Sequence, residues 1–246
     1  MLDIISFTSI ILFLSIFQTI AGVGILVLGT PILLLLGLEM VDVMTLLLPL
    51  SILNSFTNIF YLKHKIKGIQ IDSTMRNYFF LLCLPGIFLG LFILKLFVEY
   101  LNFNILVSLA IWIFLIFSYL RKKKNIDISN IFKKNLIFIT GIIHGLTNSG
   151  GSLLSILIVN TYNKSLNYLR YQIIFFYFFL ALFHYLSIII IFDSIFFAGL
   201  EVSYLLSLII GIIIGNILSK KININYLRNT IFALAFVSSV FLISQA

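Results

Sequence analysis

Two short stretches decide the fold: FQTIAGVG at residues 17–24 and IHGLTNSG at residues 143–150. They stand 126 residues apart, and each interrupts a long apolar region with glycines. A second pair of segments, GIFLG at 86–90 and GIIIG at 211–215, repeats at an offset of 125 residues. Because two independent offsets nearly agree, the sequence predicts a chain made of two related halves.

The composition is typical of a chain embedded in a lipid bilayer. Of the 246 residues, 61% are hydrophobic and 10% are charged, whereas a soluble domain has roughly 45 to 50% apolar and 25% charged residues. The longest polar interval, 121–135, has only fifteen residues, which excludes a catalytic or nucleic-acid-binding domain outside the membrane. The net charge of +8 therefore indicates basic loops, and no nucleic-acid partner is expected.

Apolar segments of about 20 residues predict transmembrane helices. Six such segments lie at 42–62, 77–96, 102–120, 168–192, 197–219 and 226–244. Two further regions do not fit this scheme, because 2–38 is too long for one crossing and 136–160 is too short for two. We expect each of them to be a hairpin of broken helices, with the breaks within 22–31 and 144–152.

The predicted fold is an all-α polytopic membrane protein with two inverted repeats, each a broken-helix hairpin plus three transmembrane helices. The first repeat is 1–120, a basic cytoplasmic linker is 121–135, and the second repeat is 136–246. Each half crosses the bilayer an odd number of times, so the second half lies upside down relative to the first. This is the inverted-repeat architecture of secondary transporters.

The basic residues predict the orientation in the membrane. Fifteen of the sixteen Lys and Arg residues fall on one side, within 63–76, 121–135, 160–170 and 220–228, and Lys95 alone lies opposite. The positive-inside rule places the basic side in the cytoplasm. We therefore expect a multi-pass protein of the bacterial inner membrane with both termini in the periplasm. The sequence leaves a homodimer open.

The two breaks are the expected substrate site. Ends of broken helices present backbone N–H groups and the positive end of the helix dipole, which suit an anion. Polar side chains are costly in hydrocarbon, so those near the breaks are candidates for completing the site. The candidate substrate-binding residues are Gln18, Gly22, Gly24, Thr30, Asn54, His144, Asn148, Ser149, Gly150, Gly151 and Ser152.

His144 and His184 are candidates for carrying a proton together with the anion, because an imidazole titrates near neutrality. A neutral, hydrogen-bonded histidine packed between helices is the alternative for both residues. Cys83 is the only cysteine, so neither a disulfide within the chain nor a metal cluster is expected. No cofactor is expected either.

The glycine motifs resemble a known family. QTIAGVGILVLGTP at residues 18–31 and HGLTNSGG at residues 144–151 are similar to the duplicated glycine motif of the sulfite exporter TauE/SafE family. The resemblance covers essentially the whole chain, although the first motif has a shorter glycine run than is usual in the family. It implies a permease that moves sulfite, sulfoacetate or related organosulfur anions.

These features predict a secondary transporter, an exporter of small anions that works by alternating access around a midmembrane site, and not an enzyme. Two alternatives stay open. Glycine-rich hairpins also build passive anion channels. The stretch TNSG at 147–150 is one glycine short of the motif of rhomboid-type intramembrane serine proteases, with Ser149 as nucleophile and His184 as base.

Overall fold

In the computed structural model, the described part of the chain consists of helices and connecting loops, without strands. The described residues are 4–66, 68–97, 99–124, 130–162, 164–192, 200–221, 236–237 and 239–244. Within them the elements are α1 (Ile4–Ala21), α2 (Ile25–Leu35), α3 (Met40–Lys65), α4 (Ser73–Tyr78), the π-helical turn η1 (Phe79–Cys83), α5 (Leu84–Phe97), α6 (Phe103–Lys124), α7 (Asn130–Thr147), α8 (Gly151–Thr161), α9 (Leu166–Phe192) and α10 (Val202–Leu218). The all-α prediction is confirmed.

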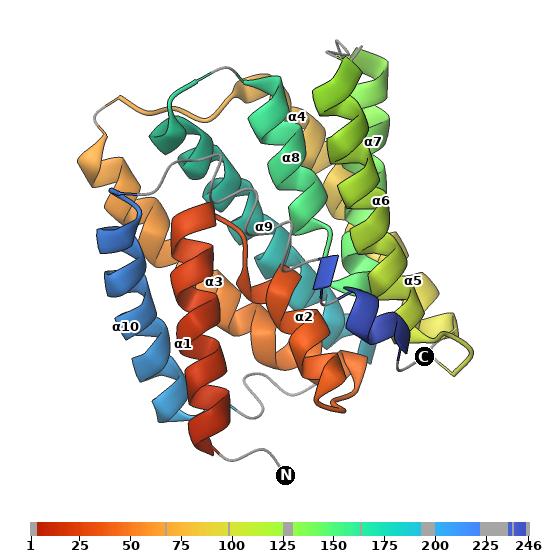
Figure 1. Cartoon of the computed structure of the whole chain (residues 1–246). Coiled ribbons are helices and arrows are strands. Elements are labelled where there is room, and N and C mark those ends of the chain that lie inside the picture. The colour runs from red at the N-terminus through yellow and green to blue at the C-terminus, as the bar shows by residue number, and fades with distance from the viewer. Residues whose placement is uncertain are drawn as a thin grey trace.

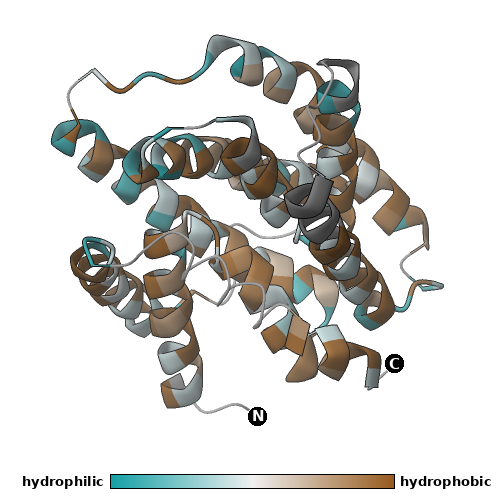
Figure 2. Cartoon of the chain, turned by 45° about the horizontal axis from the view of Figure 1, so that its top comes forward, coloured by the Kyte–Doolittle hydropathy of each residue, from teal (hydrophilic) through white to brown (hydrophobic). Residues whose placement is uncertain are grey.

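The helices have the length and composition of membrane-spanning segments. Among the described residues, three helical stretches are long and apolar enough to cross a bilayer: α3, α9 and the continuous run from α4 to α5. Apolar residues cover most of the length of the helices, and hydrophilic residues lie at many helix ends (Figure 2). The prediction of a polytopic membrane protein is therefore confirmed. Most of the predicted segment 226–244 lies outside the described residues.

Both of the irregular regions form broken-helix hairpins. Residues 22–24 separate α1 from α2, and residues 148–150 separate α7 from α8, so both breaks fall within the predicted segments. Pro31 lies inside α2. α1 and α7 begin 126 residues apart and end 126 residues apart, and the same holds for α2 and α8. The hairpin of the first half is thus repeated in the second.

The repeat extends to the backbone conformation at the breaks. Gly22 has φ 82° and Asn148 has φ 58°, and these two residues occupy equivalent positions in the halves. Both lie in the left-handed region, where glycine fits without a steric penalty and asparagine is one of the few other residues that are tolerated. The same turn therefore ends α1 and α7 with two different residues.

The two halves run in opposite directions. α1 starts near the N-terminus at the lower edge of the molecule and runs upward, whereas α7 starts at the upper edge and runs downward (Figure 1). In each half the returning helix, α2 or α8, ends on the side where its hairpin began. This is the arrangement of inverted repeats.

The glycines of α5, α7 and α10 lie where the halves touch each other. α10 packs against α1, and α5 packs against α7. A Cβ atom on Gly215 would lie 2.6 Å from the Cβ atom of Thr19 in α1, and one on Gly90 would collide with the backbone carbonyl of Ile142 in α7. The first hairpin helix of each half thus packs against a small-residue helix of the other half.

One basic residue differs from the predicted pattern. Arg170 stands where the predicted loop 160–170 overlaps the predicted helix 168–192; it lies inside α9, in its second turn, and is only 3% exposed. Lys63, Arg76 and Lys164 are exposed, as the prediction of basic loops requires. The sequence pattern missed the burial of Arg170 because composition does not show that the end of α1 packs against this turn of α9.

Candidate functional site

The two breaks meet in the interior of the molecule. Asn148 in the second break donates a hydrogen bond from Nδ2 to the hydroxyl of Thr30 in α2, at 3.1 Å. Tyr177 of α9 contacts both hairpins, because its hydroxyl accepts from the backbone N–H of Leu26 at 3.3 Å and its ring lies against Gly151. The N-terminal ends of α2 and α8 therefore converge on one tyrosine.

Every predicted site residue is buried in this conformation. The buried set comprises Gln18, Gly22, Gly24, Thr30, Asn54, His144, Asn148, Ser149, Gly150, Gly151, Ser152 and His184. The structure brings the residues of the two breaks together, as expected for a single site. Some of these residues have their polar atoms hydrogen-bonded, whereas others have polar atoms without a partner among the described residues.

The first break is satisfied by atoms of the protein itself. Gln18 accepts from the backbone N–H of Ile25 at 3.1 Å, and its amide donates to the carbonyl of Ser51 and the hydroxyl of Ser55, both at 3.0 Å. Gln18 and Tyr177 thus pair the first two N–H groups of α2. These are the donors that an anion would use at a helix N-terminus.

Asn54 lies outside the breaks, in a network of hydrogen bonds between helices. Its amide donates to the hydroxyl of Ser15 at 2.8 Å, and its carbonyl oxygen accepts from the amide of Asn58 at 3.0 Å. Asn58 also donates to the hydroxyl of Thr19 and accepts from Asn216 of α10, both at 3.1 Å. In this conformation Asn54 links α1 to α3, and its polar atoms are paired.

The second break is different, because several of its polar atoms have no partner. The rings of His144 and His184 meet edge to face, with centroids 4.7 Å apart. None of their four ring nitrogens, nor Oδ1 of Asn148, has a hydrogen-bond partner among the described residues. An unpaired buried polar atom costs about 1 to 3 kcal/mol, so this cluster is costly unless another state of the protein uses it.

The two serines of the second break are paired locally. Ser149 donates its hydroxyl to the carbonyl of Thr147 at 2.8 Å, and Ser152 donates to the carbonyl of Ser149 at 2.7 Å. The ring nitrogens of His184 accept no hydrogen bond from Ser149. The described residues thus do not form the serine–histidine dyad that a rhomboid-type protease requires.

Sequence reasoning did not place Tyr177 and Arg170 in the site. Both lie on α9, at a spacing of seven residues that continues to His184, so the three side chains share one helix face. That spacing was visible in the sequence. It became informative only once the structure showed that this face of α9 borders both hairpins.

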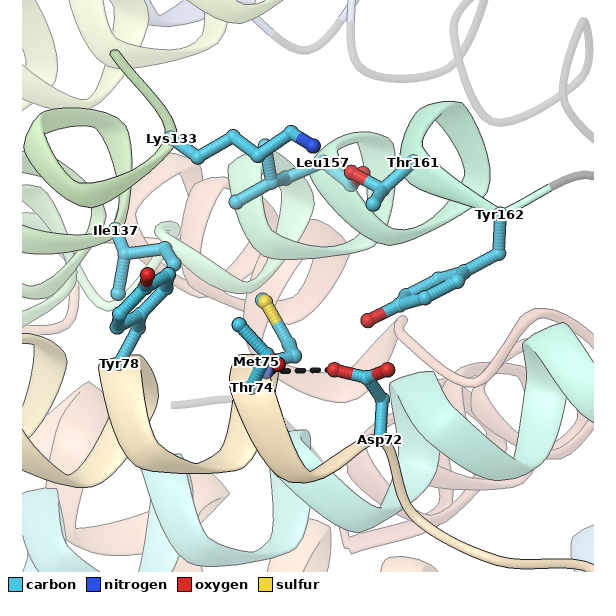
Figure 3. A pocket seen from close by; sticks show the side chains of 9 residues that line it. All are labelled: Asp72, Thr74, Met75, Tyr78, Lys133, Ile137, Leu157, Thr161 and Tyr162. Carbon is cyan, nitrogen blue, oxygen red and sulfur yellow. Dashed lines mark hydrogen bonds between the residues drawn. The ribbon is translucent and has the colours of Figure 1, made fainter. Parts of the chain in front are cut away.

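Two cavities lie at opposite ends of the molecule. The one on the basic side has a volume of about 170 Å³ and lies between α4, α7 and α8 (Figure 3). The other has a volume of about 550 Å³ and lies at the ends of α2, α3 and α6. Neither lining includes a residue of the breaks, so neither cavity reaches the site in this conformation.

The smaller cavity is lined by polar groups of both halves. Asp72 accepts from the backbone N–H of Met75 at 2.7 Å and so caps α4. The hydroxyl of Tyr162 points toward Asp72, and the side chain of Lys133 extends along the cavity (Figure 3). Burial, together with the neighbouring Asp72 carboxylate, raises the pKa of Tyr162, so its hydroxyl stays a proton donor. The contact joins the start of α4 to the end of α8.

Two inverted broken hairpins that converge inside a bundle of apolar helices have the architecture of secondary membrane transporters. The sequence profile of the family described as sulfite exporter TauE/SafE matches residues 7–242, and the chain belongs to this family. The predicted family is thereby confirmed. At the level of the family, the protein is a membrane transporter of sulfite-like anions and not an enzyme. No curated protein and no solved structure matches the chain.

Proposed function

We propose that the protein is a secondary transporter that exports small anions, such as sulfite, sulfoacetate or other organosulfur anions, across the bacterial inner membrane. The convergence of the α2 and α8 N-termini on Tyr177 is the observation that supports this most. The positive ends of the two helix dipoles there favour a negative charge. His144 and Asn148 offer unpaired polar atoms to the same region.

Alternating access accounts for the closed site. The breaks are buried, while the two cavities open at opposite ends without reaching them. In the proposed cycle the halves rock against each other, so that first one side and then the other connects to the breaks. The small-residue contacts of α1 with α10 and of α5 with α7 are the surfaces along which such a movement would occur.

The direct test is anion flux in proteoliposomes. Vesicles that contain the purified protein and are loaded with radiolabelled sulfite are expected to release it faster than protein-free vesicles, with a rate that saturates as the sulfite concentration rises. Sulfoacetate and methanesulfonate are expected to compete, and chloride at the same ionic strength is the control. Equal release from both kinds of vesicle for all three sulfur anions would contradict the proposal.

A passive channel gives a different result in the same vesicles. A carrier exchanges anions, so unlabelled sulfite on the far side is expected to accelerate the movement of labelled sulfite. A channel shows no such acceleration and produces single-channel currents in planar bilayers. Currents without exchange would replace the carrier with the channel.

The proposed orientation has both termini in the periplasm and the basic loops in the cytoplasm. In a Cys83→Ala background, the exposed Tyr100→Cys is expected to react with a membrane-impermeant maleimide in cells whose outer membrane is permeabilised. Lys164→Cys, which is also exposed but lies on the basic side, is expected to react only after the inner membrane is opened. The reverse pattern would invert the orientation.

A further inference from the structure

Arg170 is a buried cation with few partners. It lies in the second turn of α9, on the basic side of the breaks, and is 3% exposed. Its Nη2 donates to the backbone carbonyl of Thr19, near the C-terminal end of α1. Its Nε has no partner among the described residues. Tyr61 of α3 interacts with it electrostatically, and none of the described carboxylates does.

A buried guanidinium without a carboxylate is costly. Buried charges in proteins are normally paired, and ionisable residues inside a membrane protein mark the path of a substrate or ion. The five acidic residues that the structure describes, Glu39, Asp42, Asp72, Glu99 and Glu201, form no ion pair with Arg170. Arg170 therefore has no counter-charge among the described residues, and a bound anion would supply one.

Arg170 belongs to a polar face of α9 that follows both hairpins. Arg170, Tyr177 and His184 are spaced by seven residues, so they share one side of the helix at intervals of about 10 Å. Arg170 meets the end of α1, Tyr177 meets the starts of α2 and α8, and His184 meets His144 of α7. Along α9, this face therefore contacts first the helices of the first break and then those of the second.

The equivalent face in the first half carries no charge. The repeat offset of 126 residues relates Arg170, Tyr177 and His184 of α9 to Met44, Ser51 and Asn58 of α3. A requirement of the fold alone would place similar residues in both halves. The cation is therefore specific to one half, on the basic side of the site.

We propose that Arg170 binds the transported oxyanion and neutralises its charge as the anion passes between the basic side and the breaks. This inference rests on the proposed function and assigns one of its binding residues. The planar guanidinium can donate two parallel N–H groups to two oxygens of a sulfite or sulfonate group. In the closed conformation described here, the carbonyl of Thr19 accepts one of these donors.

A purely structural role would be to cap α1. A cation near the C-terminal end of a helix stabilises it through the helix dipole. Arg170→Lys keeps the charge for this purpose but loses the planar pair of donors, whereas Arg170→Gln loses both. The exposed Arg76→Gln is the matched control for the loss of one positive charge.

The test measures sulfite binding to the full-length protein in detergent by isothermal titration calorimetry, with thermal unfolding in sulfite-free buffer as the readout of folding. Wild-type and Arg76→Gln proteins are expected to bind sulfite with equal affinity. Arg170→Gln is expected to raise the Kd by about 10- to 100-fold, as for the loss of a hydrogen bond to a charged group. Arg170→Lys is expected to raise the Kd by about tenfold because the planar pair of N–H donors is lost.

An unchanged Kd in folded Arg170→Gln overturns the assignment. If that variant does not fold, Arg170→Lys decides, and an unchanged Kd in the lysine variant overturns the assignment as well. A wild-type protein that binds neither sulfite nor methanesulfonate contradicts the proposed function itself, which is a distinct result. A loss of thermal stability in Arg170→Gln, with sulfite affinity unchanged, would leave only the cap on α1.

Discussion

His144→Gln and His184→Asn are each expected to reduce anion flux in proteoliposomes by about tenfold or more and to remove its dependence on pH. Each substitution introduces the residue found at the equivalent position of the first half, which is Gln18 for His144 and Asn58 for His184. A protonated imidazole gives an anion a charge-assisted hydrogen bond, worth about 1.5 to 3 kcal/mol. Losing 1.36 kcal/mol already slows a step about tenfold.

The direction in which flux changes with pH is part of this prediction. If the two imidazoles carry a proton with the anion, wild-type flux rises as the pH falls from about 8 to about 6, because a lower pH favours the protonated imidazole. Methanesulfonate is the preferred substrate for this measurement, because its own charge does not change in that range. The variants are expected to be equally slow at both pH values.

The third histidine provides the control. His64 is exposed at the end of α3, so His64→Asn is expected to keep both the flux and the pH response of the wild type. Wild-type behaviour in His144→Gln and His184→Asn would show that the histidine pair only fills space between α7 and α9.

Gly90→Leu is expected to destabilise the protein strongly. Even a single Cβ atom at this position would collide with the carbonyl of Ile142 in α7, and it would lie 3.1 Å from the Cα atom of Gly145. Backbone cannot move aside as a flexible side chain can, so α5 and α7 must separate. Overpacking of this kind costs up to about 3 kcal/mol, which corresponds to a fall of roughly 6 to 12 °C in the Tm of a chain of this size.

The neighbouring residue Leu89 provides the control for the packing effect. Leu89 is 41% exposed on the outer side of α5, and Leu89→Ala is expected to change the Tm in detergent far less than Gly90→Leu. Circular dichroism during heating measures both variants. Equal Tm values would mean that the contact between α5 and α7 contributes little to stability.

The hairpins were predictable because their signals are local. Glycines that interrupt an apolar run mark a break wherever they occur, and the repeat offset of 126 residues could be read directly from the sequence. The structure places both breaks within the predicted segments. The candidate site residues are the glycines and polar groups at the breaks together with Asn54 and His184, and all of them are buried.

The pairing state of those residues could not be predicted from the sequence. Gln18 and His144 are equivalent by repeat and look like equal candidates. Gln18 is paired by α2 and α3, whereas neither ring nitrogen of His144 has a partner among the described residues. Part of the difference arises from residues that are distant along the chain, because Ser51 and Ser55 accept hydrogen bonds from the Gln18 amide.

The sequence by itself determined the class of the protein: an apolar chain of two related halves with a glycine break in each. Those properties depend on composition and spacing, which the linear chain carries in full. Only the tertiary structure decided which break is satisfied and which has unpaired donors and acceptors, and that Arg170 is buried and not part of a loop. Hydrogen-bond pairing and burial depend on which helices are neighbours, and helix neighbours are set by packing between the two halves.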